Sequence, residues 1–279
     1  MNINLESFSI TDCIHGTMIW PKDDAVIGRC LVLYGEWSEG ENIIMSRFIS
    51  KGDIVLDIGS NIGTTVLSLS KLVGCNGRVI AFEPQSLISQ CLHTNLTINN
   101  ITNVSVENAA VSNKAGWARI NDSKYAEIGR YGEPGIAKEG TRIRTLTLDE
   151  LEVPKCNLIK IDVEGHELQV IKGGQQFLNK HRPTLYMEAK KDVADTKKYL
   201  KWLFENGWTC YWHFASWFRL NNHKNNNNNI FHGVGDMNIL AQPNEKDQPN
   251  NLLKLRNYNE EWNSEKIRRF YRDNKIELI

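Results

Sequence analysis

The stretch IVLDIGSNIG, residues 54–63, decides the fold of this chain of 279 residues. Residues 54–58 form an apolar run that only Asp57 interrupts, which is typical of a strand buried on both faces of a parallel sheet. Glycines at positions 59 and 63 form a turn, and residues 64–73 then have the pattern of a helix that ends at Gly74. The order of strand, glycine turn and helix predicts the start of a βαβ unit.

Short apolar runs alternate with helix-period segments further along the chain. The predicted elements are, in order, 78–82, 84–100, 104–106, 157–162, 164–180, 184–187 and 192–206, of which the second, fifth and seventh are helices. This rhythm predicts right-handed crossovers and an α/β fold with a doubly wound, mostly parallel sheet.

The rhythm breaks between residues 108 and 147. Val111 and residues 117–120 flank NKAG, residues 113–116, which predicts a hairpin turn. Residues 121–140 are polar and have no clear period, and a loop of this length is more often a lid or a binding loop than filler. Regular structure is expected to resume at 141–146. The spacing of Thr147 and Glu150 is that of a capping box, which predicts a short helix.

The last third of the chain predicts an antiparallel hairpin at one edge of the sheet. Residues 208–214 and 233–241 are strand-like and flank an asparagine tract, residues 225–229, whose composition favours a solvated loop. A basic helix is expected at 262–271. We therefore divide the chain into a segment 1–50 that packs on the core, a domain 51–241, and a linker with a helix, 242–279.

Composition excludes several classes of protein. Lys plus Arg (33) equals Asp plus Glu (33), which argues against a dedicated nucleic-acid-binding protein. No apolar run approaches the roughly 18 residues of a membrane span, and the first residues, MNINLE, do not have the pattern of a signal peptide. The six cysteines include no C-x-x-C pair, which disfavours a disulfide scaffold or a zinc ribbon. We expect a cytoplasmic protein without a nucleic-acid or membrane partner, and we predict no oligomeric state.

The polar residues at the glycine turn distinguish between nucleotide ligands. A dinucleotide site would have glycine in place of Asn61, so that the backbone could contact a pyrophosphate. The carboxylate of Asp57 would repel a pyrophosphate and suits a ligand with an ammonium group. Glu83, about 20 residues past the turn, can accept hydrogen bonds from both hydroxyls of a ribose. A ribose, a positive charge and no phosphate together indicate S-adenosylmethionine (SAM) rather than NAD. The alternative is that the glycines make only a tight turn and that Glu83 only caps the next helix.

Several motifs resemble, in order, those of the FkbM family of SAM-dependent methyltransferases. They are DIGSNIG (57–63), AFEP (81–84), NAAV (108–111), IKIDVEGHE (159–167) and IKGG (171–174), preceded by IGR (27–29) and YGEW (34–37). The resemblance covers residues 19–241, and 159–167 is its most specific part. It implies a Rossmann-like class I methyltransferase with a seven-stranded, mostly parallel sheet and an antiparallel edge strand. It also implies SAM as the cofactor and O-methylation, often of sugars or natural products.

Residues at predicted strand ends supply the expected cofactor site, because the carboxyl ends of parallel strands line one crevice. We assign Asp57 to the methionine ammonium, Glu83 to the ribose, Asn108 and Ala109 to the adenine, and Asp162 to the space below the sulfonium. The full set assigned to cofactor binding is Glu36, Asp57, Gly59, Ser60, Asn61, Gly63, Glu83, Pro84, Asn108, Ala109 and Asp162.

An acceptor hydroxyl must lose a proton, so the site needs a general base. His166 and Glu164 are the first candidates and Glu188 is another, although a single histidine is more often structural. Asp162 and Glu164 offer oxygen ligands for a divalent cation, but no third acid is evident nearby, and we predict no metal. A stacking role for Trp217 against a sugar is a further hypothesis. The acceptor is expected to be a glycan or a small molecule. The alternative function is a non-catalytic SAM-fold module that binds a glycan or a protein.

Overall fold

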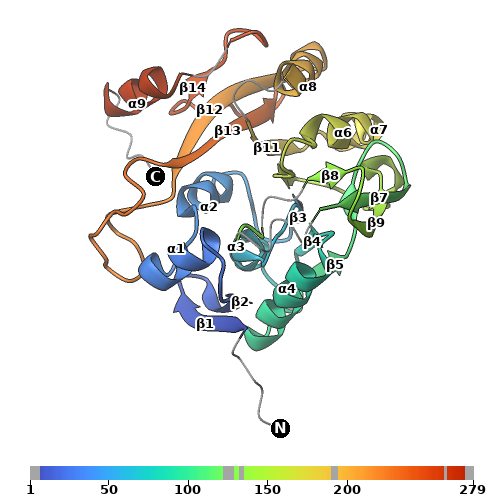
Figure 1. The fold of residues 1–279 in the computed structure, drawn as a ribbon. Coiled ribbons are helices and arrows are strands. Elements are labelled where there is room, and N and C mark those ends of the chain that lie inside the picture. Colours follow the sequence, from blue (N-terminus) through green and yellow to red (C-terminus); the bar gives the residue numbers. More distant parts are fainter. Residues whose placement is uncertain (1–6, 122–128, 132–134, 190–193, 261–262, 274–279) are drawn as a thin grey trace.

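A mixed sheet of eight strands forms the centre of the protein (Figure 1). The computed structural model describes residues 7–121, 129–131, 135–189, 194–260 and 263–273. The strand order across the sheet is β14 (Leu253–Lys254), β12 (Trp208–Ser216), β13 (Gly235–Pro243), β11 (Thr184–Glu188), β10 (Leu158–Ile161), β3 (Ile54–Ile58), β4 (Arg78–Phe82) and β5 (Val104–Glu107).

The five strands from β11 to β5 are parallel, as the alternation of strands and helices predicts. From β3 the chain proceeds outward through β4 to β5, and it then returns to place β10 on the other side of β3. The strand order therefore reverses between β3 and β10. In open α/β sheets, ligands bind at such a reversal, beyond the carboxyl ends of the strands.

The predicted hairpin is present, and it completes a seven-stranded sheet to which the two-residue β14 adds an eighth strand. Strands β12 and β13 pair in antiparallel register from Trp208 with Pro243 to Ser216 with Gly235. The prediction differs from the structure in one detail. The antiparallel strand β13 is inserted between β11 and β12 and is not the outermost strand, because β13 turns back from β12 and pairs with β11 on its other side.

Helices cover the sheet, and a second hairpin packs on one of them. Helix α3 (Thr64–Val73) packs on β3 and β4, and α4 (Ser86–Ile98) packs on β5. The hairpin of β1 (Phe8–Cys13) and β2 (Gly16–Pro21) rests on α4 and is followed by α1 (Ile27–Tyr34) and α2 (Glu39–Ser46). Met18 and Trp20 of β2 are 1% exposed and belong to the same hydrophobic core as Val55 and Leu56 of β3. The N-terminal segment is thus part of the packed structure that supports the sheet.

The predicted helix 164–180 is divided in two. Helix α6 (Glu167–Lys172) ends at Gly173, and α7 (Gln175–His181) begins after Gly174. A Cβ atom on Gly173 would overlap the carbonyl oxygen of Ser112, and one on Gly174 would press on Leu148. The glycine pair therefore lets the short helices lie directly against the β6 region, at the cost of a continuous helix.

The predicted hairpin at 113–116 is wrong, because its flanking strands belong to a small four-stranded sheet in which they are not neighbours. Its strand order is β6 (Ala110–Val111), β9 (Thr141–Leu146), β7 (Gly116–Ile120) and β8 (Ile136–Ala137). Strand β9 lies between β6 and β7 and pairs with both, so residues 113–116 reverse the chain without joining two paired strands. The short helix after Thr147 is present as a 3-10 turn, η1 (Leu148–Glu150), with its capping box.

The C-terminal third packs against β12. Helix α8 (Ala194–Glu205) and α9 (Ser264–Asp273) both contact this strand, and the buried Tyr271 hydroxyl donates a hydrogen bond to the carbonyl of Trp212 (3.2 Å).

The asparagine tract is largely exposed, as its composition predicts, but it is also anchored. The Tyr34 hydroxyl donates to the carbonyl of Asn228 (3.0 Å), and the Asn226 amide donates to that of Leu33 (3.1 Å). Among the helices in the described ranges, none combines the length and apolarity that crossing a bilayer requires.

Candidate functional site

The glycine turn after β3 packs directly on the end of β10. Gly59 has φ +87°, and a Cβ atom there would overlap the carbonyl oxygen of Asp162. The backbone N–H groups of Gly59 and Ser60 both donate to the carbonyl of Phe82, at 3.0 Å each. The turn is therefore held from two neighbouring strands, and only glycine fits the position that faces β10.

Glu83 connects the end of β4 to the same turn. Its carboxylate accepts the backbone N–H of Asn61 at 2.9 Å and that of Gln85 at 2.8 Å. The side chain is 4% exposed, and burial raises its pKa to about 7 although both hydrogen bonds oppose this shift. A carboxylate oxygen has more than one lone pair, so each oxygen can also accept a hydrogen bond from a ligand.

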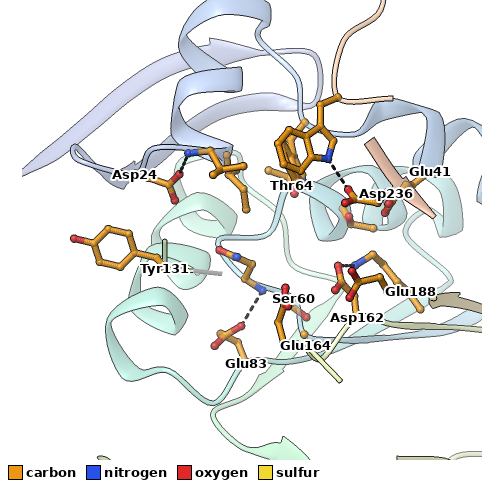
Figure 2. Close-up of a pocket in the computed structure, with 18 of the residues that line it drawn as sticks. Asp24, Glu41, Ser60, Thr64, Glu83, Tyr131, Asp162, Glu164, Glu188 and Asp236 are labelled. Carbon is orange, nitrogen blue, oxygen red and sulfur yellow. Dashed lines mark hydrogen bonds and ion pairs between the residues drawn. The ribbon is translucent and has the colours of Figure 1, made fainter. Parts of the chain in front are cut away.

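A cavity of about 310 Å³, the main cavity, opens at the carboxyl ends of the parallel strands (Figure 2). The β3–α3 turn, the ends of β4, β10 and β11, strand β13 and the segment 129–131 contribute to its walls. Its lining includes Asp24, Trp37, Glu41, Gly59, Ser60, Asn61, Thr64, Glu83, Arg130, Tyr131, Lys160, Asp162, Glu164, Glu188, Trp217, Asp236 and Asn238. Seven of the residues named in this list are acids and two are bases.

A second cavity of about 60 Å³, the small cavity, adjoins the main one and is mostly apolar. Gly59, Glu83, Asp162 and Glu164 line both cavities. The remaining wall of the small cavity includes Phe82, Pro84, Gln85, Ala109, Val111, Ile120, Ile136 and His166. Glu83 thus stands at the junction between an apolar cavity and a strongly acidic one.

Lys160 forms the centre of a buried group of charges beneath the main cavity. Its ammonium lies 2.9 Å from the Asp162 carboxylate. Asp57 is its direct cross-strand partner between β10 and β3, so the two side chains lie on one face of the sheet. Burial raises the pKa of Glu41 to about 8 and that of Asp57 to about 7, and in both cases the Lys160 ammonium opposes the shift. Although burial disfavours the charge of Lys160, the surrounding carboxylates raise its pKa.

The structure brings most of the predicted site residues to the two cavities. Gly59, Ser60, Asn61, Glu83, Pro84, Ala109 and Asp162 are cavity-lining residues, as are the three candidate bases. The bases are not equivalent. Glu164 and Glu188 line the main cavity, whereas His166 lines the small one. The Nε2 atom of His166 lies 2.9 Å from the Ser112 hydroxyl, and burial lowers the pKa of the imidazole.

Four residues assigned to the cofactor site do not line either cavity. Glu36 is 3% exposed and forms an ion pair with Arg219 (2.7 Å). Asn108 donates its amide to the carbonyl of Glu83 (2.7 Å), so it supports the turn at the end of β4. Gly63 faces the side chain of Leu92. Asp57 is fully buried beside Lys160, and neither of its carboxylate oxygens has a hydrogen-bond partner among the described residues.

Several residues that line the main cavity were not predicted from the sequence. A lysine within the apolar run LIKI, residues 158–161, was a visible signal, because a buried charge needs partners. Asp236 and Asn238 are two residues apart in a strand and therefore share a face. Trp37 is the last residue of the motif YGEW (34–37), which was visible in the sequence, whereas Glu41 had no comparable signal, because the N-terminal segment reaches the site only through the tertiary fold.

Three acids come close enough to hold a cation, which corrects the expectation that no third acid is near. One carboxylate oxygen each from Asp162, Glu164 and Glu188 lies within 4.8 Å of the others. Glu188 joins the pair because β11 runs parallel to β10, with Met187 opposite Ile161. The Lys160 ammonium, however, already neutralises Asp162.

The fold and the site define a class I methyltransferase, whose parallel sheet carries the ligand site at its carboxyl edge. A sequence profile of the Methyltransferase FkbM domain matches residues 57–210, and the chain belongs to this family. The resemblance described from the motifs is thereby confirmed over this central span.

A curated relative is the hexuronic acid methyltransferase AglP of Haloferax volcanii, which is 36% identical over 126 residues. The matched region covers 43% of this chain and 49% of AglP, so the chain spans about half the length of that relative.

Solved structures with a similar fold include an FkbM methyltransferase from Methylobacillus flagellatus, 15% identical with a TM-score of 0.49, covering 67% of this chain and 43% of that one. A SAM-dependent methyltransferase from Aquifex aeolicus is 16% identical with a TM-score of 0.42, covering 76% and 90% of the two chains.

Proposed function

We propose that this protein binds SAM across the two cavities and transfers its methyl group to a hydroxyl of a sugar, a glycan or a small natural product. The observation that carries the proposal is the position of Glu83. It is a buried carboxylate at the junction of the two cavities, tied to the glycine turn by the N–H of Asn61. Family membership supports the same assignment.

The residues present fit SAM on two counts. The apolar walls of the small cavity suit a purine, and Glu83 offers lone pairs to the two ribose hydroxyls. The acidic walls of the main cavity suit a ligand with ammonium and sulfonium charges, and they would repel a pyrophosphate.

Bound SAM supplies an electrophilic methyl group, and the protein's task is to orient the acceptor and to take its proton. Glu164 and Glu188 are placed for the proton transfer, because both line the main cavity at the ends of β10 and β11. We favour Glu188 as the general base, since a carboxylate within reach of a hydroxyl can accept its proton in the transition state. His166 lies at the small cavity and contacts Ser112, so its position favours a supporting role.

A sugar acceptor draws support from the relative. The hexuronic acid methyltransferase AglP acts on a sugar acid, as its name states, and it matches this chain over 126 residues. Because the match covers about half of that protein, the acceptor of this chain is part of the proposal.

Two measurements test the proposed function. Calorimetry with S-adenosylhomocysteine (SAH), the demethylated product of SAM, should show binding to one site per chain. Incubation with methyl-labelled SAM and a panel of glycans should then give labelled product. Absence of SAH binding would overturn the cofactor assignment. Binding without transfer to any member of the panel would favour the non-catalytic alternative.

A further inference from the structure

Two tryptophans form an aromatic wall at one end of the main cavity. The rings of Trp37 and Trp217 lie 5.0 Å apart between centroids with a tilt of 44°, and both side chains line the cavity. The indole N–H of Trp217 donates to the Asp236 carboxylate at 2.7 Å, and Phe231 packs edge-on against the ring at 5.4 Å. The ring of Trp217 is therefore fixed in one orientation. An indole surface of this kind attracts the polarised C–H bonds of a sugar ring through its negative π face.

Hydrogen-bonding groups surround the same wall. Asp236 and Asn238 project from one face of β13, and Glu188 ends β11. The amide of Asn238 also donates to the Glu41 carboxylate at 3.2 Å, which draws α2 into the site. Figure 2 shows Asp236, Glu41, Glu188 and Asp162 gathered on one side of the cavity, opposite Asp24 and Tyr131. Carboxylates accept hydrogen bonds from hydroxyl groups, so an aromatic wall bordered by acids matches a polyhydroxylated ring.

The negative charge around the aromatic wall of the main cavity favours neutral over acidic sugars. Among the cavity-lining residues in the described ranges, the basic ones are Lys160 and Arg130. The Lys160 ammonium is paired with Asp162. Arg130 belongs to the segment 129–131, in which the Gly129 carbonyl accepts from Ala25 and the Tyr131 hydroxyl donates to Asp23, so this segment is anchored on the side of Asp24. A carboxylate on the acceptor would thus meet carboxylates at the aromatic wall, and like charges in contact disfavour binding.

We infer that the end of the cavity formed by Trp37, Trp217, Asp236 and Glu188 is the acceptor subsite, and that it takes an uncharged sugar ring in preference to a uronate. The inference rests on the proposed function and narrows its acceptor to one chemical class. It also distinguishes this chain from its relative, whose name identifies a hexuronic acid as the substrate. Glu188 lines the main cavity, so it would then lie beside both the acceptor sugar and bound SAM, where the general base is needed.

Matched pairs of sugars provide the test. Nitrophenyl glycosides of glucose, galactose and mannose are compared with those of glucuronate, galacturonate and mannuronate, as ligands and as acceptors of labelled methyl, with the protein saturated with SAH or SAM. The inference predicts that at least one hexoside binds, and that each hexoside that binds does so about tenfold or more tightly than its uronate. A preference for the uronate in any pair, or no binding by either series, would overturn it. SAH affinity, measured separately, reports on the cofactor site alone.

Three variants of the subsite and one control variant test whether these residues cause the preference. Trp217→Ala should weaken binding of the hexoside about tenfold while SAH affinity stays unchanged, and Trp217→Phe should restore part of it. The control is Trp117→Ala, because Trp117 is 63% exposed on β7 and does not line either cavity. Asp236→Asn should reduce the discrimination against the uronate while it keeps an acceptor for the Trp217 N–H. Unchanged hexoside affinity in Trp217→Ala, or unchanged discrimination in Asp236→Asn, would contradict the inference.

Discussion

The carboxylate of Glu83 accepts the backbone N–H of Asn61 at 2.9 Å, so a side chain at the end of β4 holds the glycine turn at the end of β3. The same carboxylate accepts the N–H of Gln85 and lines both cavities. The acid that we assign to the ribose therefore also shapes the wall of its own site (Figure 2). In the proposed function, structural and binding roles coincide in one residue.

Gly59→Ala should lose cofactor binding, because the added Cβ overlaps the carbonyl oxygen of Asp162. Gly52→Ala is the matched control, since Gly52 has nearly the same φ (+88° against +87°) and its Cβ would meet nothing within 4 Å. The control should lose about 1 kcal/mol of unfolding free energy from backbone strain alone. Gly59→Ala should lose at least about 1–3 kcal/mol more from steric overlap. Urea unfolding and SAH calorimetry measure both effects, and equal losses in the two variants would show that the close approach is unimportant.

Asp57→Asn should stabilise the protein at alkaline pH. Burial raises the pKa of Asp57 from 3.8 to about 7, so its stabilising contribution is complete below pH 3.8 and is lost as the pH rises through 7. The amide cannot ionise, and the variant should gain on the order of 2–4 kcal/mol over the native protein at pH 8 but little at pH 4. Urea unfolding at both pH values gives the difference. A variant that is less stable than the native protein at pH 8 would mean that attraction to Lys160 outweighs burial. Glu205→Gln, at a side chain 59% exposed, serves as the control.

Glu188→Gln should reduce turnover about 100-fold or more with little change in SAH affinity, because it removes the base that we place beside the acceptor. His166→Gln keeps a polar group near Ser112 at the small cavity and should retain turnover within about threefold, because the residue is far less suited to act on the acceptor. The rate of methyl transfer to the best sugar of the panel is the measurement. The opposite ranking of the two variants would make His166 the base.

Asn95→Ala should destabilise the fold by about 2–4 kcal/mol, because the alanine leaves buried backbone groups without partners. The Asn95 amide is fully buried, and it bonds both backbone groups of Ile19 and the carbonyl of Ile62. It thus ties the N-terminal hairpin to α4 and to the glycine turn. Thr94→Ala, at an exposed neighbour in the same helix, should stay within about 0.5 kcal/mol. Thermal unfolding compares the two variants, and a similar small loss in both would show that the tie contributes little.

The local pattern of the sequence was sufficient for the central part of the fold. Strand β3 and helix α3 lie where the stretch 54–73 predicts them, because the buried apolar run and the glycines act on adjacent residues. The pairing of strands that are distant in the sequence could not be predicted in the same way. Residues 113–116 do reverse the chain, but β9 lies between the two flanking strands and pairs with β7, and no local pattern indicates this pairing.

The site residues also differ in this way: those next to strand ends could be predicted from local sequence, and those brought together by the tertiary fold could not. Glu83 and Asp162 follow strand ends in sequence, and both line the cavities. Asp57 is still inside β3, so its side chain points to a face of the sheet, toward Lys160, and away from the open edge. Glu41, Trp217 and Asp236 line the same cavity, although Glu41 and Asp236 are almost 200 residues apart in the sequence. No local pattern links these segments.

SAH affinity of Glu83→Ala and Glu83→Gln tests the central assignment most directly. Both variants should bind SAH about 30-fold more weakly or worse, because hydrogen bonds to a buried carboxylate typically contribute about 1.5–3 kcal/mol. Glu205→Gln should bind as the native protein does, and thermal unfolding should show that each variant is folded at the temperature of the titration. Unchanged SAH affinity in a folded Glu83→Ala or Glu83→Gln variant would contradict the account.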